Sequence, residues 1–288
     1  MRTWSYALCF FAPLFLTACD RTPEDTGLPS DTDTDTDTDT DTDTDTDTDT
    51  DTDTDTDTDT DWSCNEGPGE TDPFFGGLDE TLVSSDAYTF SAGIAAVIAA
   101  SPAENGETVT LDPPLDVTGG VVINTGYAPD GAVPSDIWIA DQDGAIRTWG
   151  AAISEVATAA APGMKVSFKV SEIKNYAGEL EITKISDWVV DGEGEKILVQ
   201  NLNDVAASYA THGRQNAQLW GEIASEPEAC GGSFNCYDYT FASGTAVIRA
   251  SNTLEFKVGD CVELVAPIGT FNGNIQFNLS NWDWYRWF

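Results

Sequence analysis

The chain has 288 residues, of which 50 are acidic and 12 are basic, so its formal net charge is −38. Such an average field repels a phosphate backbone, which disfavours nucleic-acid binding unless a local basic patch overcomes it. The chain has one histidine, His212, so hydrolytic triads and His-rich metal sites have little support.

Residues 1–18 have the features of an export signal. Arg2 gives a positive start, and residues 7–16 form an apolar run that is too short to span a bilayer. The run leads into the tetrapeptide LTAC at 16–19. This tetrapeptide resembles the lipobox of bacterial lipoproteins, a Leu-small-small-Cys signature at which the signal is removed before the cysteine.

The resemblance implies that Cys19 is the first mature residue and carries lipid on its thiol. A lipidated Cys19 would make the bilayer a partner and place the protein in the bacterial cell envelope. We expect the protein to be located at the outer membrane or the cell surface. Asp20 directly follows the cysteine, and since Asp at this position retains some bacterial lipoproteins in the inner membrane, the inner membrane is the alternative location. A plain secretory signal with an incidental cysteine is the alternative.

Residues 19–61 form a predicted disordered linker. Asp alternates with Thr from Asp31 to Asp61, and this run supplies 16 of the 50 acidic residues. It has no apolar side chain to bury, and its carboxylates repel each other, so the sequence predicts an extended chain. We interpret the run as a spacer; weak cation binding and glycosylation of the threonines are alternatives.

Residues 62–112 are predicted to form an N-terminal segment. Within it, "FSAGIAAVIAASP" at 90–102 predicts a short helix, with Ser91 as its N-terminal cap and Pro102 beyond its end.

The rest of the chain contains a repeat at a spacing of about 100 residues. "IWIADQDGAIR" (137–147) aligns with "YTFASGTAVIR" (239–249), and "NYAGELEI" (175–182) aligns with "TFNGNIQF" (270–277). The shared order and the shared apolar alternation predict two related β-domains, at 113–190 and 215–288, joined by a linker at 191–214.

Each unit has five predicted strands. In the first they lie near 117–123, 137–140, 145–149, 166–170 and 180–185, and an Ala-rich segment at 151–163 predicts a helix between the third and fourth. In the second they lie near 219–223, 237–241, 245–249, 261–265 and 275–279. The order strand-strand-strand-helix-strand-strand is that of the OB-fold. The predicted fold class is therefore all-β with short helices, as two tandem five-stranded OB-like barrels behind an acidic stalk.

The pattern "IWIADQDGAIR…PGMKVSFKV…YAGELEI" is similar to OB-fold domains of secreted bacterial proteins. The resemblance covers 113–190 and 215–288 and includes no catalytic residue, so what it implies is a fold and a binding or structural role.

Four cysteines remain outside the signal and the lipid site. In an exported protein they predict two disulfides. Cys230 and Cys236 flank a short Gly-containing loop that closes easily, which leaves Cys64 to pair with Cys261. Zinc binding is the weaker alternative, because no CxxC pair or neighbouring histidine supports it.

Trp138, Arg147 and Arg249 are the candidate ligand-binding residues. Trp138 alternates with Ile137 and Ile139, so it is expected to point away from the barrel core, and the two arginines occupy matching repeat positions. OB-folds commonly bind ligands on these strands, where an outward Trp near an Arg can stack on a base or a sugar. The alternative is that Trp138 packs on the other barrel or on the N-terminal segment.

Other candidate sites have simpler explanations. Asp141 and Asp143 are weak Ca²⁺ candidates that a hairpin turn explains well. Asp191, Glu193 and Glu195 form a second acidic cluster that is equally incomplete as a Ca²⁺ site. His212 is interpreted as a solvated linker residue. The C-terminal "NWDWYRWF" is expected to seal the second barrel or to join the two barrels.

The sequence therefore favours a non-enzymatic, membrane-anchored envelope lipoprotein, with no cofactor, whose barrels serve binding or structural assembly. The ligand is expected to be a glycan or a protein, and nucleic acid is less favoured. An oligonucleotide- or polysaccharide-binding protein that uses the OB faces is the leading alternative, and a hydrolase is the third.

Overall fold

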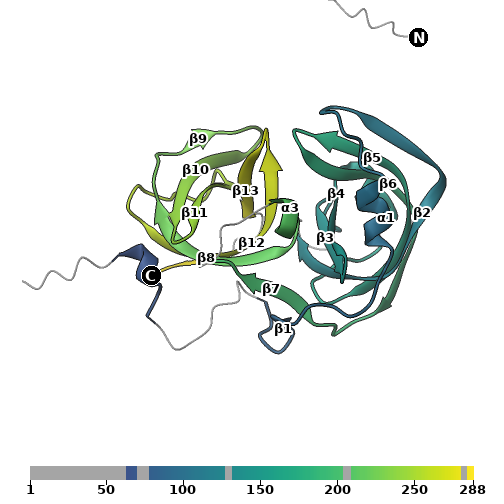
Figure 1. The fold of residues 1–288 in the computed structure, drawn as a ribbon, viewed down its shortest axis with the longest axis horizontal. Helices are drawn as coiled ribbons and strands as arrows, with labels where there is room; N and C mark the ends of the chain where they lie inside the picture. Colours follow the sequence, from purple (N-terminus) through teal and green to yellow (C-terminus); the bar gives the residue numbers. More distant parts are fainter. Residues whose placement is uncertain (1–62, 70–77, 127–131, 204–208, 280–283) are drawn as a thin grey trace, which may run out of the picture. The chain divides into compact units, whose positions relative to one another are not determined.

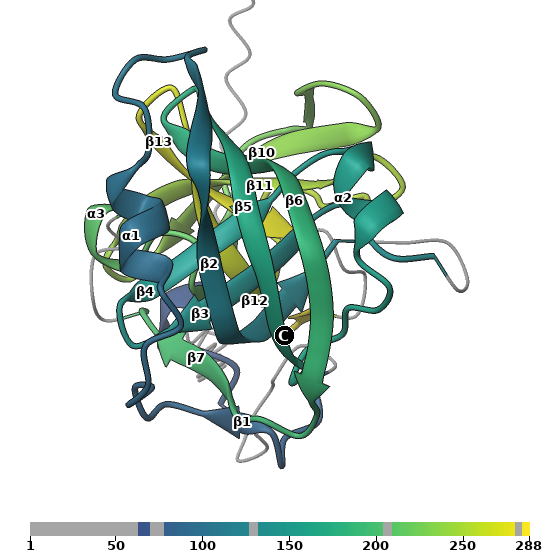
Figure 2. The ribbon, with the colours of Figure 1, turned by 90° about the vertical axis from the view of Figure 1, so that its right-hand side faces the viewer.

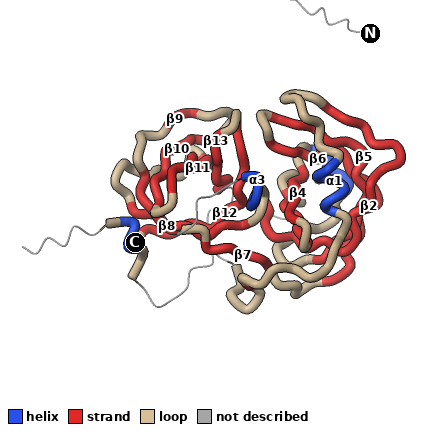
Figure 3. Tube along the Cα trace, in the orientation of Figure 1, coloured by secondary structure: helices blue, strands red, loops and turns tan. Residues whose placement is uncertain are grey.

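A computed structural model describes residues 63–69, 78–126, 132–203, 209–279 and 284–288. The export signal, Cys19, Asp20 and the Asp–Thr run lie outside these residues. The described part forms one compact unit that is built mainly of β-strands with a few short helices (Figure 3). Two closed barrels, which we call barrel 1 and barrel 2, make up most of it (Figure 1).

Barrel 1 is closed by five strands in the spatial order β2-β3-β4-β6-β5. These strands are β2 (Thr108–Thr125), β3 (Ile137–Asp141), β4 (Gly144–Thr148), β5 (Lys165–Tyr176) and β6 (Glu179–Gly192). Figure 2 shows β2, β5 and β6 as long neighbouring strands, and antiparallel pairing joins β5 to each of the others. Two short helices, α1 (Ile94–Ala99) and α2 (Ala151–Val156), pack against this barrel and bury Ile94, Val97 and Ile153 in its core.

Barrel 2 repeats the same topology. Its strands are β8 (Asn216–Ile223), β10 (Phe234–Phe241), β11 (Gly244–Ser251), β12 (Cys261–Phe271) and β13 (Asn274–Leu279). They follow the order β8-β10-β11-β13-β12, and pairing of β12 with β8 closes the ring. The matching order confirms the predicted fold class, two tandem OB-like barrels.

Two glycines at matching positions of the repeat mark where the first strand of each barrel crosses the second. A Cβ on Gly120 would lie 2.6 Å from Cγ2 of Ile139, and a Cβ on Gly221 would collide with the carbonyl oxygen of Thr240. Only glycine fits at such a close approach of two strands, which explains why the repeat preserves it.

The smaller elements correct three expectations. The predicted linker at 191–214 contains two regular elements, β7 (Ile197–Asn201) and α3 (Tyr209–His212). The strand β7 pairs in parallel with β8 and with β1 (Val83–Ser84). His212 is half-buried rather than solvated. Ser91 does not cap α1, because the N-cap is Gly93 and the Ser91 hydroxyl donates to Asp143 instead.

Both ends of the described part are tied to barrel 2. The Cys64–Cys261 disulfide links the 3-10 helix η1 (Cys64–Glu66) to β12. The Cys230–Cys236 disulfide closes the loop that leads into β10. The short strand β9 (Glu228–Ala229) precedes this loop and pairs with β10. Both predicted pairings are confirmed. At the C-terminus, β14 (Tyr285–Trp287) pairs with β12 and Trp284 is buried, so the aromatic tail seals barrel 2 as one expectation had it.

In the part of the chain that the structure describes, no helix combines the length and the apolar character that crossing a membrane requires.

Candidate ligand-binding cleft

A cleft of about 550 Å³ is lined by residues of both barrels, and we call it the inter-barrel cleft. Barrel 1 contributes Arg147, Trp149, Lys174, Tyr176, Glu179 and Glu181. Barrel 2 contributes Phe234, Arg249, Phe271 and Gln276, together with the Cys230–Cys236 loop. The volume is typical of pockets that bind small ligands, and aromatic side chains with a few convergent polar groups are the usual lining of such pockets.

The repeat explains why these residue types meet. Arg147 and Arg249, Tyr176 and Phe271, and Glu181 and Gln276 are three pairs that occupy matching positions in the aligned segments, and all of them line the cleft. Related surfaces of the two barrels therefore face the same space.

Hydrogen bonds join the two barrels at the base of the cleft. The Thr270 backbone N–H donates to Oε2 of Glu179 at 2.9 Å, and the Arg214 Nε donates to the Ala145 carbonyl at 2.6 Å. Farther from the cleft, the Asn124 and Asn216 side chains are bonded to each other at 2.9 Å, and both are buried. Buried polar contacts of this kind fix the relative placement of the surfaces that form the cleft.

Arg147 is held in one orientation by charge and by aromatic rings. Its Nη2 lies 2.7 Å from Oδ1 of Asp136, and its Nη1 lies 3.9 Å from Oε1 of Glu181. Its guanidinium carbon lies 5.1 Å from the Trp138 ring centroid and 4.6 Å from that of Trp149. Burial alone would lower the pKa of Arg147, but the neighbouring carboxylates outweigh it and raise that pKa, so the side chain is a permanent cation.

Glu179 and Glu181 are buried carboxylates on one face of β6. Burial raises the pKa of both, and that of Glu181 rises to about 7 although Arg147 opposes the shift. Arg214 lies 3.9 Å from Oε1 of Glu179, and this oxygen has no hydrogen-bond partner among the described residues. Near neutral pH, Glu181 is therefore divided between its charged and neutral forms.

Aromatic rings border the cleft at several points. Tyr176 and Phe271, whose ring centroids are 6.2 Å apart, lie beside the hairpin turns of the two barrels and are 48% and 45% exposed. These turns touch, because the Asn272 N–H donates to the Ala177 carbonyl at 2.8 Å. Trp149 and Phe234 are half-buried. The cleft therefore offers both exposed and recessed aromatic faces.

The structure places two of the three predicted ligand-binding residues in this cleft and corrects the third. Arg147 and Arg249 line it, but Trp138 does not. Trp138 does point away from the core of barrel 1, yet it is 1% exposed because it packs in the hydrophobic cluster of barrel 2. Trp138 therefore packs on the other barrel, as the alternative prediction stated.

The acidic candidates have structural roles. Asp141 is 3% exposed and accepts the N–H groups of Ala92, Ile94 and Asp143, so it fixes the β3–β4 turn against the start of α1. Asp191 accepts the Ser167 hydroxyl, Glu195 pairs with Lys165 at 2.8 Å, and the side chain of Glu193 is not part of the cleft lining. Within the described ranges, no group of three His, Cys, Asp or Glu residues could hold a metal ion.

Sequence reasoning missed Trp149, Lys174, Phe234, Glu179 and Glu181, and it treated Tyr176 and Phe271 only as matching positions of the repeat. The two glutamates had a readable signal, because they alternate with Leu180 and Ile182 in a predicted strand and so share the face that leaves the core. The remaining three gave no signal that separates them from ordinary surface or core residues.

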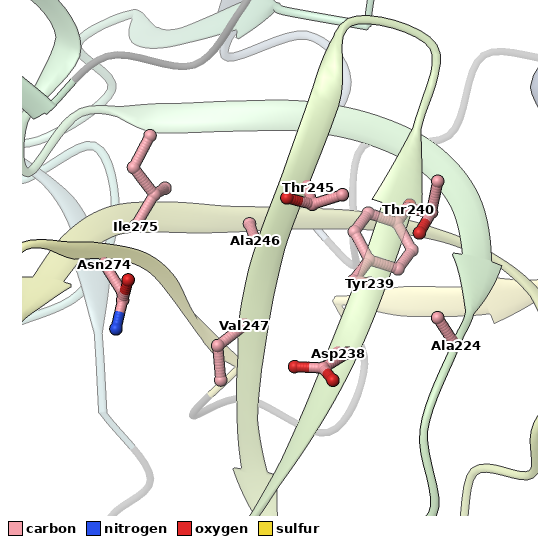
Figure 4. Close-up of a pocket in the computed structure, with 9 residues that line it drawn as sticks. All are labelled: Ala224, Asp238, Tyr239, Thr240, Thr245, Ala246, Val247, Asn274 and Ile275. Carbon is pink, nitrogen blue, oxygen red and sulfur yellow. The ribbon is translucent and has the colours of Figure 1, made fainter.

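A second hollow, of about 460 Å³, lies on β10 and β11 of barrel 2 (Figure 4). Its lining includes Asp238, Thr240, Thr245 and Asn274 but no Lys or Arg, and its one aromatic residue, Tyr239, is fully buried. It offers a ligand fewer distinctive contacts than the inter-barrel cleft does.

No protein-family model matches the chain, and no curated protein sequence matches it. Among solved structures, it is similar to the tetrameric p202 HIN2 domain, at 11% identity and a TM-score of 0.29 over 64% of this chain and 95% of that one. The p204 HINb domain gives 12% identity and a TM-score of 0.28 over 62% of this chain and 100% of that one. A murine DNA-binding protein bound to double-stranded DNA gives 11% identity and a TM-score of 0.30 over 60% of this chain and 94% of that one.

TM-scores this low carry no argument about the present chain. What defines its class is its own strand pairing, which makes it a tandem OB-like protein with a cleft between the two barrels.

Proposed function

We propose that this chain is a lipid-anchored envelope protein that binds a glycan, without catalysis, in the inter-barrel cleft. The observation that carries the binding proposal is the convergence of aromatic and charged side chains from both barrels on one hollow of about 550 Å³. A sugar has an apolar ring face and a rim of hydroxyls, so it can use both kinds of side chain, and OB-folds are known to bind oligosaccharides.

A glycan suits the site better than an extended nucleic acid does. The cleft has room for only a few rings, and an oligonucleotide that extended beyond it would cross a strongly acidic surface. Of the residues after 61, 31 are acidic and ten are Lys or Arg. That surface would repel a chain of phosphates, whereas a ligand that is largely uncharged would not be affected.

The double substitution Tyr176→Ala/Phe271→Ala tests the binding proposal. Ligands are found first by probing glycan and oligonucleotide arrays with the purified protein, and affinities are then measured by calorimetry. We expect the double variant to bind the selected glycan at least about tenfold more weakly, because stacking on one aromatic side chain contributes roughly 1–3 kcal/mol. Its melting temperature should change little, since both rings are about half exposed.

Trp287→Ala is the matched control, because Trp287 is 53% exposed and lies outside the cleft lining. Unchanged glycan affinity in the Tyr176→Ala/Phe271→Ala variant, or an oligonucleotide as the tightest ligand on the arrays, would refute the proposal.

Glu179 and Glu181 favour a second candidate, glycoside hydrolysis, which requires two carboxyl groups flanking the scissile bond. Both project from the same face of one strand, and each lies beside an arginine. They would approach a bound sugar from one direction, which suits binding better than bond cleavage. Recovery of shortened glycan after incubation with the protein would instead establish the hydrolase.

The anchor is supported by the LTAC tetrapeptide at 16–19. When the chain is produced in bacteria fed with labelled palmitate, we expect label on the protein and recovery in the membrane fraction. Cys19→Ser should lose both, because one cysteine carries the lipid. Label that persists in Cys19→Ser, or its absence from the unaltered chain, would contradict the proposal.

A further inference from the structure

Positive charge is concentrated at the inter-barrel cleft. Ten of the 12 Lys and Arg residues follow residue 62, and four of these ten line the cleft or contact its carboxylates: Arg147, Lys174, Arg214 and Arg249. Two of the four lie beside carboxylates, Arg147 beside the partly buried Asp136 at 2.7 Å and Arg214 beside the buried Glu179 at 3.9 Å.

Lys174 and Arg249 are placed differently. Among the described residues neither forms an ion pair with a carboxylate, and each lies against an aromatic ring. The Lys174 Nζ is 5.0 Å from the Tyr176 ring centroid, and the Arg249 guanidinium carbon is 3.6 Å from that of Phe234. Burial and the nearby Arg147 lower the pKa of Arg249, so its positive charge is incompletely compensated.

Half-buried cations without a carboxylate partner favour an anion from outside the chain. A guanidinium can hold a carboxylate through two parallel hydrogen bonds, and an ammonium adds a flexible donor. The aromatic side chains that lie against these two cations, Tyr176 and Phe234, also line the cleft.

We infer that the inter-barrel cleft takes an acidic oligosaccharide, whose carboxylate is held by Lys174 and Arg249 while its sugar rings lie against Tyr176, Phe234 and Phe271. The inference rests on the proposed function, since it names the class of glycan bound at the same site. One carboxylate inside the cleft gains these contacts, whereas a long polyanion would also meet the acidic surface outside it.

Glu181 makes this binding dependent on pH. The charged groups around it are Arg147 on β4, Lys174 on β5, Glu179 on its own strand, Asp136 before β3 and Arg249 on β11. A ligand carboxylate held by these cations would disfavour the ionised form of Glu181, so binding should be accompanied by proton uptake. Affinity is then highest below pH 7, where Glu181 is neutral, and falls as the pH rises through about 7.

The test compares short oligosaccharides that carry one uronic acid residue with their methyl esters, which keep the sugar shape but lose the charge. With the full chain, calorimetry should show that at least one acid form binds about tenfold more tightly than its ester. Lys174→Gln and Arg249→Gln should each weaken acid binding about tenfold and weaken ester binding clearly less, since a charge-assisted contact contributes roughly 1.5–3 kcal/mol. Arg249→Lys should restore part of the loss.

Lys169→Gln is the matched control, because it removes the same charge from the same strand. Lys169 is exposed, pairs with Asp187 at 2.7 Å and lies outside the cleft lining, so acid binding should not change. Glu181→Gln should keep tight binding at high pH and abolish the change near pH 7.

Each outcome separates the two proposals. If the esters bind as tightly as the acids, the acidic ligand is wrong while glycan binding stands. If Lys169→Gln weakens acid binding as much as Lys174→Gln, the placement of the carboxylate at Lys174 and Arg249 is wrong while glycan binding stands. If no acid or ester binds and no array glycan binds, both are wrong. Tighter binding of a single-stranded oligonucleotide than of any uronic-acid oligosaccharide also overturns both.

Discussion

Replacing Trp138 by alanine is expected to destabilise the protein by about 3–5 kcal/mol, the usual cost of truncating a buried large aromatic side chain. Trp138 is 1% exposed, and its ring belongs to the hydrophobic cluster that holds the core of barrel 2, although the residue itself lies on β3 of barrel 1. The cavity would therefore open where the two barrels meet, and Arg147 would lose one of the two rings beside it.

Urea denaturation followed by circular dichroism measures this loss. Trp287→Ala is the control of the same residue type, and we expect a smaller cost, on the order of 1 kcal/mol, because Trp287 is 53% exposed and makes edge contacts with neighbouring rings and one exposed hydrogen bond, to Asp260. If Trp138 were instead an outward residue that stacks on a ligand, Trp138→Ala would lose ligand with unchanged stability. Unchanged stability of Trp138→Ala would show that the ring is not buried between the barrels.

The second large effect concerns the two disulfides. Cys64 and Cys261 are 197 residues apart, whereas Cys230 and Cys236 are 6 apart. In the chain-entropy description, a bond that closes a longer loop restricts the unfolded chain more, which gives about 5 kcal/mol for the first disulfide and about 2 kcal/mol for the second. Cys64→Ser/Cys261→Ser should therefore cost clearly more stability than Cys230→Ser/Cys236→Ser.

Denaturant midpoints of the two double variants, measured without reductant, provide the comparison. Each pair removes one disulfide and adds two hydroxyl groups, so each variant controls for the chemical change in the other. Equal losses, or a larger loss for Cys230→Ser/Cys236→Ser, would show that the long loop is already restricted in the unfolded state.

Local patterns were sufficient to locate the ten barrel strands in their order along the chain. Apolar alternation in "IWIADQDGAIR" and its matched segment located the second and third strands of both barrels to within a few residues. The long first and last strands of barrel 1 were predicted too short, because their outer halves extend beyond the barrel core and have weaker alternation. The strand at 197–201 was missed because it is short and one of its two partner strands, β1, is distant in sequence.

The cleft shows what local patterns leave open. Arg147 and Arg249 were singled out because they occupy equivalent positions, and they do line it. Trp138 has the same outward direction, yet it is buried, because whether an outward side chain meets water or another barrel depends on how the barrels dock.

The sequence by itself determined the two OB-like barrels, the disulfide pairing and the acidic composition, because strand periodicity, short loop closure and charge are properties of neighbouring residues or of residue counts. Only the tertiary structure decided that Glu179, Glu181, Lys174 and Phe234 share one cleft with the two arginines. Their proximity arises from the packing of one barrel on the other, which depends on shape and on buried hydrogen bonds between segments about 90 residues apart, such as Asn124 and Asn216.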